Sequence, residues 1–86
     1  MNINNLIAIV KKKIESQITL DKIEVVDKSF LHKNHPGNDK AKFHLKIYIK
    51  SQELKKLNQI ERSRIIYKIL NKEMKEFIHS LQILIN

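Results

Sequence analysis

Residues 43–50 alternate strictly between apolar and polar side chains, and this alternation constrains the fold more than any other feature of the sequence. Apolar side chains occupy every odd position from Phe43 to Ile49. The even positions carry His44, Lys46, Tyr48 and Lys50. A period of two is that of a β-strand, so the segment predicts a strand with one face on a core. The other face, including His44, is expected to point toward water.

The residues before this strand predict a helix and another strand. Residues 3–17 are predicted to form a helix, and Asn4 or Asn5 is positioned to cap its start. Residues 23–26 are rich in β-branched side chains, which is typical of a strand. The polar segment 28–42 holds the only glycine and the only proline, at Pro36-Gly37, and is predicted to be a loop. The apolar side chains of the helix recur on one face, at Ile3, Leu6, Ile7, Val10 and Ile14.

The residues after the alternating strand predict two helical segments and a last strand. Residues 51–57 read as a short helical turn, and Asn58 with Glu61 forms a pair like a capping box for a new helix. That helix runs to residue 76. Residues 77–85 read as a strand that carries His79 on the same side as its apolar residues, Leu81, Ile83 and Ile85. The buried face of the preceding helix is formed by Ile66, Ile69, Leu70 and Met74.

These elements give the order α-β-β-α-α-β. The 86 residues are enough for one domain and too few for two, so residues 1–86 are expected to be a single unit. The fold class is α+β, with helices on one face of a three-stranded sheet. Residues 51–76 also resemble a helix-turn-helix pair, a shape that some DNA-binding proteins use.

Composition limits the compartment and the partners. The formal net charge of +8 suggests an anionic partner such as nucleic acid. The abundance of Lys, Ile and Asn is also what A/T-rich codons produce without selection for binding. The chain has no cysteine, no run long enough to span a membrane and no signal-peptide pattern, so a cytoplasmic protein that does not insert into membranes is expected.

The residues needed for common enzymatic chemistry are missing, and we expect the chain not to be an enzyme. Without cysteine there is no thiolate, and no serine lies in a glycine-flanked turn of the nucleophile-elbow kind. A single glycine excludes a glycine-rich phosphate loop and the GXXG clamp of a KH domain. The acidic residues are expected to be surface partners of nearby lysines.

The histidines are the candidate functional residues. His32 and His35 lie three apart in the polar loop, and His79 lies at the start of the last strand. Neutral imidazole is a ligand for zinc, copper, iron or nickel. The alternative is equally simple, because loop histidines are often plain surface residues and His79 could bond a backbone carbonyl.

The arrangement of these residues resembles the BolA family over nearly the whole chain. The pattern D-x-S-x-x-H appears as Asp27, Ser29 and His32, and a second histidine follows at His35. The most specific block runs without a gap from Arg62 to Leu81; its matching residues are Arg62, Arg64, Tyr67, Leu70, Glu73, Ile78, His79 and Leu81. The sequence departs from the family where a central histidine is Ser63, where an F-x-G turn is Leu54-Lys55-Lys56, and where a phenylalanine after His44 is Leu45.

The resemblance implies a KH-like fold of class II without a GXXG loop. It also implies an adaptor that forms a heterodimer with a monothiol glutaredoxin and shares a [2Fe-2S] cluster with it and with glutathione. The ligands carried over by position are His79 and His32, with His35 as the alternative loop ligand. The chain without cysteine is expected to hold no cluster by itself and to be a monomer when alone.

The family is also ascribed a second role, as a DNA-binding transcriptional regulator of stress and morphology responses. For this chain that alternative would use the basic surface and the segment 51–76. Arg62, Arg64, Tyr67 and His44 are the candidate docking residues for a partner protein or for DNA. The arginines could instead form salt bridges with Glu61 or Glu73, and Tyr67 could simply pack with an exposed hydroxyl.

Overall fold

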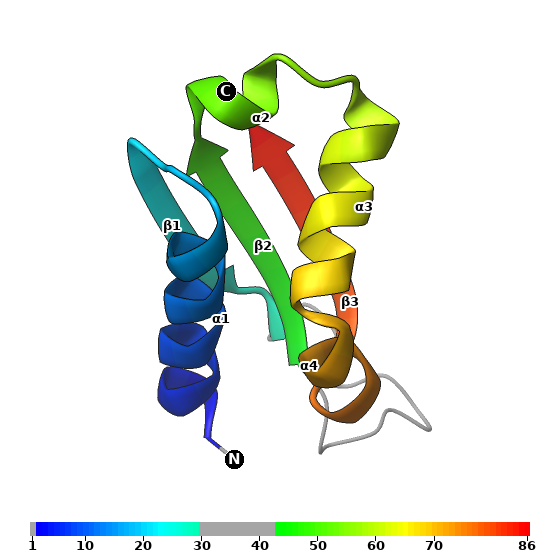
Figure 1. Ribbon diagram of the computed structural model, residues 1–86. Helices are drawn as coiled ribbons and strands as arrows, with labels where there is room; N and C mark the ends of the chain where they lie inside the picture. Colours follow the sequence, from blue (N-terminus) through cyan, green and yellow to red (C-terminus); the bar gives the residue numbers. More distant parts are fainter. Residues whose placement is uncertain (1, 30–42) are drawn as a thin grey trace.

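The computed structural model describes residues 2–29 and 43–86, which form one layer of helices against one sheet (Figure 1). The chain begins with helix α1 and continues through strands β1 and β2 into three consecutive helices and a last strand. The bounds are α1 Ile3–Gln17, β1 Lys22–Asp27, β2 Phe43–Lys50, α2 Gln52–Lys55, α3 Gln59–Ile69, α4 Asn71–Glu76 and β3 Ile78–Ile85. The predicted order and the α+β class are confirmed, with the last predicted helix divided in two.

The sheet is mixed, with the strand order β1-β2-β3. β1 pairs antiparallel with β2, and β3 pairs parallel with β2, so the helices α2 to α4 form the crossover between the two parallel strands. All four helices lie on one side of the sheet (Figure 1). The buried members of the core between them are all aliphatic, with Phe43, Met74 and Phe77 among the partly buried side chains packed against it. The buried members are Leu6, Val10, Ile14, Ile18, Val25, Leu45, Ile47, Ile49, Leu54, Ile66, Leu70 and Ile78.

Helix α1 has the predicted bounds, and its buried residues are Leu6, Val10 and Ile14. The predicted cap is wrong by two or three positions. Asn2 is the N-cap, and its side chain accepts a hydrogen bond from the Asn5 N–H at 2.8 Å. Asn2, Asn4 and Asn5 share the same capping preference, so residue type alone does not decide which of them caps the helix.

The single helix predicted from residue 58 to residue 76 is wrong, because α3 ends at Ile69 and α4 begins at Asn71. Leu70 between them has φ −98° and ψ 18°, outside the helical range. Asn58 is confirmed as the cap of α3, since its side chain accepts from the Glu61 N–H at 2.9 Å. The change of direction at Leu70 leaves that side chain fully buried and turns the chain toward the start of β3.

Helix α4 is tied to α1 by an ion pair that the sequence did not predict. The Lys13 ammonium contacts the Glu73 carboxylate at 2.7 Å, and Glu73 is only 4% exposed. Glu73 was expected to be a surface partner of a nearby lysine, and to be available to an arginine; instead its partner is 60 positions away in the chain. Local sequence spacing carries no signal for such a pair.

Within residues 2–29 and 43–86, no helix is long and apolar enough to cross a lipid bilayer. The longest of them, α1, has 15 residues, and its polar face carries three lysines in a row.

Candidate functional site

Asp27, His44 and His79 lie at one end of the sheet because of the strand directions. β2 and β3 are parallel, so both begin at this end, and β1 runs antiparallel to β2, so it finishes there. Phe43 at the start of β2 pairs with Ile78 at the start of β3, and Leu45 pairs with Asp27 at the end of β1. The end of β1 and the start of β2 therefore lie at the same end of the sheet as the start of β3.

The chain leaving β1 is held by the first two residues of the D-x-S-x-x-H pattern. The Ser29 N–H donates to the Asp27 carboxylate at 2.9 Å, which forms an Asx-type turn. The Ser29 hydroxyl in turn accepts from the His44 N–H at 3.0 Å, and the Lys28 N–H donates to the His44 carbonyl at 2.7 Å. Asp27 and Ser29 thus fix the path of the chain against β2.

His44 is buried, so the prediction that it faces water is wrong. Only 6% of it is exposed, and its Nδ1 lies 2.6 Å from the Ser80 hydroxyl oxygen on β3. Its ring also packs against the ring of His79, with 4.9 Å between centroids and 59° between planes. Alternation along β2 fixes the side of the sheet on which His44 lies, but it does not reveal the contacts of the ring with Ser80 and His79 of β3.

His79 is exposed because it is the extra residue of a β-bulge. Phe43 pairs with Ile78 and the next residue, His44, pairs with Ser80, so His79 has no partner in the ladder. The prediction that His79 shares a side with Leu81, Ile83 and Ile85 is therefore wrong. Ile78 and Leu81 both turn toward the helices, and the two residues between them, His79 and Ser80, are exposed.

An exposed imidazole at a strand end fits the role of a single metal ligand supplied to a shared site. The part of the chain that the structure describes contains no group of three His, Asp or Glu side chains placed to hold a metal ion. His32 and His35, the predicted loop ligands, lie outside the described residues, as does Pro36-Gly37. Among the described residues, the imidazole rings at this end of the sheet are those of His79 and its neighbour His44.

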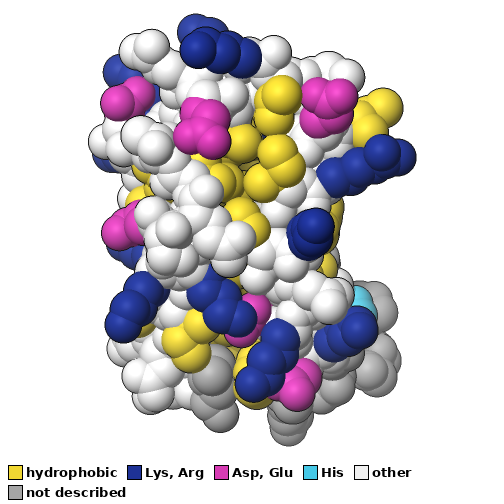
Figure 2. All heavy atoms as spheres, viewed as in Figure 1, with side chains coloured by type: hydrophobic (Ala, Val, Ile, Leu, Met, Phe, Trp, Pro, Cys, Tyr) yellow, Lys and Arg dark blue, Asp and Glu magenta, His cyan; other side chains and the backbone are white. Residues whose placement is uncertain are grey.

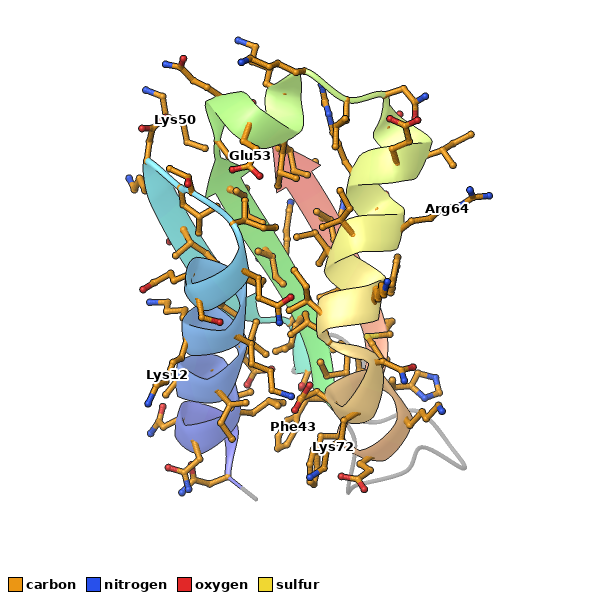
Figure 3. The ribbon with its side chains drawn as sticks, viewed as in Figure 1. Lys12, Phe43, Lys50, Glu53, Arg64 and Lys72 are labelled. Atoms are coloured by element: carbon orange, nitrogen blue, oxygen red, sulfur yellow. The ribbon has the colours of Figure 1, made fainter. Side chains whose placement is uncertain are left out.

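The candidate docking residues do not form one cluster. Arg62 is directed inward, and its guanidinium donates to the carbonyls of Leu54, Leu57 and Lys55 at 2.7–2.8 Å. Arg64 points from α3 into solvent (Figure 3). Tyr67 is 41% exposed, and its hydroxyl donates to the Leu81 carbonyl at 3.2 Å, two residues from His79. Tyr67 is thus bonded near the histidine end of β3, where His44, the fourth candidate, packs against His79.

Ser80 is the site residue that sequence reasoning missed. Its hydroxyl oxygen lies 2.6 Å from Nδ1 of the buried His44 imidazole. The signal that could have revealed it is the double polar step His79-Ser80 between two apolar residues, which is the pattern a bulge leaves in a strand.

A protein-family model described as "BolA-like protein" matches residues 14–86. The DNA-binding transcriptional regulator BolA of Haemophilus influenzae is 29% identical over 73 residues, covering 85% of this chain and 68% of that protein. Among solved structures, the BolA domain of SufE1 from Arabidopsis thaliana superposes with a TM-score of 0.80 at 26% identity, covering 100% of this chain and 93% of that one. BolA1 from Arabidopsis thaliana gives 0.76 at 22% identity, covering 92% and 87%.

Proposed function

Because the chain belongs to the BolA-like protein family, we propose that it is an adaptor that pairs with a monothiol glutaredoxin and shares a [2Fe-2S] cluster with it. The observation that carries the proposal is the exposed imidazole of His79 on the bulge at the start of β3. The proposed complex is a heterodimer in the cytoplasm, and it assigns the chain a binding role and no catalytic one.

The chemistry of the chain supports a shared site rather than one of its own. Iron–sulfur clusters are held chiefly by cysteine thiolates, and this chain has no cysteine. The thiolates would come from the glutaredoxin and from glutathione, and the chain would contribute neutral imidazole. His79 is held on a strand and against the ring of His44, so its position is set before a partner arrives.

The second ligand in this proposal is His32, with His35 as the alternative. His32 follows Ser29 by three residues, so it lies within about 11 Å of the Ser29 Cα by chain length alone. Ser29 is itself bonded to the backbone of His44, whose ring touches His79. This maximum distance along the chain supports a loop histidine as the second cluster ligand beside His79.

The test is reconstitution with a monothiol glutaredoxin, glutathione, iron and sulfide under anaerobic conditions. His79→Ala is expected to abolish the visible absorption and circular dichroism of the mixed cluster, while Gln82→Ala, an exposed change on the same strand, should leave them intact. Calorimetry of the cluster-free proteins then separates docking from ligation. An unchanged spectrum in His79→Ala would rule out this ligand, and absence of any heterodimer would rule out the adaptor role.

Separate His32→Ala and His35→Ala variants identify the loop ligand. We expect His32→Ala to alter the spectrum and His35→Ala to leave it largely unchanged. The reverse result would assign the role to His35. If neither change alters the spectrum, the second ligand is not a loop histidine.

DNA binding is the second candidate, favoured by the relative from Haemophilus influenzae that is named a DNA-binding transcriptional regulator. In this chain the first helix of the pair that resembles a helix-turn-helix, α2, has only four residues. Arg62 is bonded to backbone carbonyls, which leaves Arg64 as the exposed arginine of α3. Binding to duplex DNA that shows a sequence preference and is weakened by Arg64→Ala would support this candidate; binding without sequence preference would count against it.

A further inference from the structure

The side of the sheet away from the helices forms a second surface, separate from the histidine end. Its residues follow from the strand register, because neighbours in the ladder share a face. We call it the open sheet face; it is formed by Lys22, Glu24 and Val26 of β1, Lys46, Tyr48 and Lys50 of β2, and Gln82 and Leu84 of β3.

Lysines surround this face and continue beyond its end. Lys22 and Lys50 are direct cross-strand partners, an arrangement of like charges that lowers stability unless an anion lies between them. At the same end a cavity of about 390 Å³ is lined by two further lysines, with a single acid; its lining is Asp21, Lys50, Gln52, Lys55, Lys56 and Asn86. Figure 3 shows Lys50 at this end of β2, far from the end where Phe43 and Lys72 lie.

Tyr48 lies at the centre of the open sheet face. Its neighbours across the strands are Glu24 and Leu84, and Leu84 is itself 39% exposed. The Lys46 ammonium lies 5.0 Å from the centre of the Tyr48 ring, within the range of a cation–π contact. Lys46 and Lys50 are each two residues from Tyr48, about 6.7 Å along the strand. One half-buried aromatic ring is therefore flanked by two lysines along the strand, Lys46 lying over the ring, and by Glu24 on the neighbouring strand.

We infer that the open sheet face binds single-stranded nucleic acid, with a base stacked on Tyr48 and the backbone phosphates along Lys46 and Lys50 toward Lys55 and Lys56. Proteins that bind single-stranded nucleic acid without sequence preference stack its bases on aromatic rings and place basic side chains along its phosphates. A duplex keeps its bases paired and stacked internally, so it offers no free base to Tyr48. Both arginines are on α3, so this face has no guanidinium group to form paired hydrogen bonds with the edge of a base. Binding should therefore tolerate many nucleotide sequences.

This surface does not depend on the proposed glutaredoxin partner or on His79. The whole 86-residue chain is titrated against fluorescein-labelled dT12, rU12 and a 12-base-pair duplex, with anisotropy as the readout. We expect the single strands to bind more tightly than the duplex. The slope of log affinity against log salt should be about −2 to −3, as three or four phosphate contacts give. The two single strands distinguish DNA from RNA.

The decisive variants separate stacking from charge. Tyr48→Leu should weaken binding to the single strand at least about fivefold, the low end of what one lost stacked base costs, while Tyr48→Phe should bind within twofold of the wild type. Lys46→Gln with Lys50→Gln should weaken binding further than Lys12→Gln with Lys72→Gln, which removes the same charge from exposed positions on the helix side (Figure 3).

Thermal melting of each variant confirms that it is folded before its affinity is compared. Equal affinity of Tyr48→Leu and the wild type would overturn the inference. So would equal losses in the two lysine pairs, or tighter binding of the duplex, because each of these would make the overall charge, and not this face, the determinant.

Discussion

Arg62 is the residue that closes the turn between α2 and α3. Its Nε–H is shared between the carbonyls of Leu54 and Leu57, both at 2.8 Å, and its terminal nitrogen donates to the Lys55 carbonyl at 2.7 Å. The Leu54 carbonyl also accepts from the Leu57 N–H at 3.1 Å, so Arg62 adds a side-chain donor to the backbone bonds that close the turn. The family resemblance marks Arg62 as part of its most specific block, and the geometry gives that position a structural reason.

Replacing Arg62 with lysine keeps the charge but removes the planar fork. We expect Arg62→Lys to lower the free energy of unfolding by about 1–3 kcal/mol, since a single ammonium cannot reach all three carbonyls in the geometry of the guanidinium. Urea denaturation measures the change. Arg64→Lys, at an exposed position on the same helix, should change the stability by less than about 0.5 kcal/mol. Equal effects of the two changes would contradict the role assigned to Arg62.

At the scale of elements, α1 and α4 are joined by the Lys13–Glu73 pair across the core. Glu73 is nearly buried, whereas the Lys13 side chain is 38% exposed. A carboxylate left in that position without its partner would pay a desolvation cost that nothing nearby offsets. The pair therefore holds two helices that are distant in the sequence in a fixed relation.

Removing only the lysine tests this relation. Lys13→Met should lower the free energy of unfolding by about 2 kcal/mol, a value reduced for the partial exposure of Lys13. Adding Glu73→Leu should recover most of that loss, because the buried charge is removed together with its partner. Lys12→Met, at the adjacent exposed position, is the matched control. No recovery in the double variant would show that the cost arises from packing instead.

The elements that sequence patterns predicted well are those with long, uninterrupted periodicity. The bounds of α1 and β2 agree with the prediction at both ends, because their apolar residues recur at a single period throughout. The break at Leu70 was missed because Ile66, Leu70 and Met74 continue the helical spacing across it with no Gly or Pro. The sequence placed His79 correctly at the start of the last strand, and its role as a ligand stays a prediction. Its surroundings depend on the pairing of β2 with β3, which no local pattern specifies.

At the scale of the whole molecule, the core is a single thin aliphatic layer between the helices and the sheet. A domain of this size is expected to be stable by about 4–13 kcal/mol in total. Figure 2 shows apolar side chains of this layer reaching the surface between the helices, with Lys, Arg, Asp and Glu side chains around them. A molecule with so little interior depends on every large side chain within it.

Leu6 illustrates this dependence, because it is completely buried in the core. Leu6→Ala should lower the free energy of unfolding by about 2–5 kcal/mol, through lost burial and the cavity left behind. The melting temperature should fall by at least about 10 °C. Ile60→Ala, at a position 65% exposed, should leave it nearly unchanged. A similar small effect at both positions would mean that α1 contributes less to the core than its burial indicates.

The bulge at His79 also has a consequence for how this position can vary over time. Leu81, Ile83 and Ile85 must alternate correctly for β3 to bury its inner side, so any change to their spacing would be selected against. His79 is outside that alternation, with no partner in the ladder. The alternation that buries the inner side of β3 therefore places no demand on the His79 side chain, whose ring packs against that of His44. One extra residue separates two evolutionary demands that a regular strand would impose on the same positions.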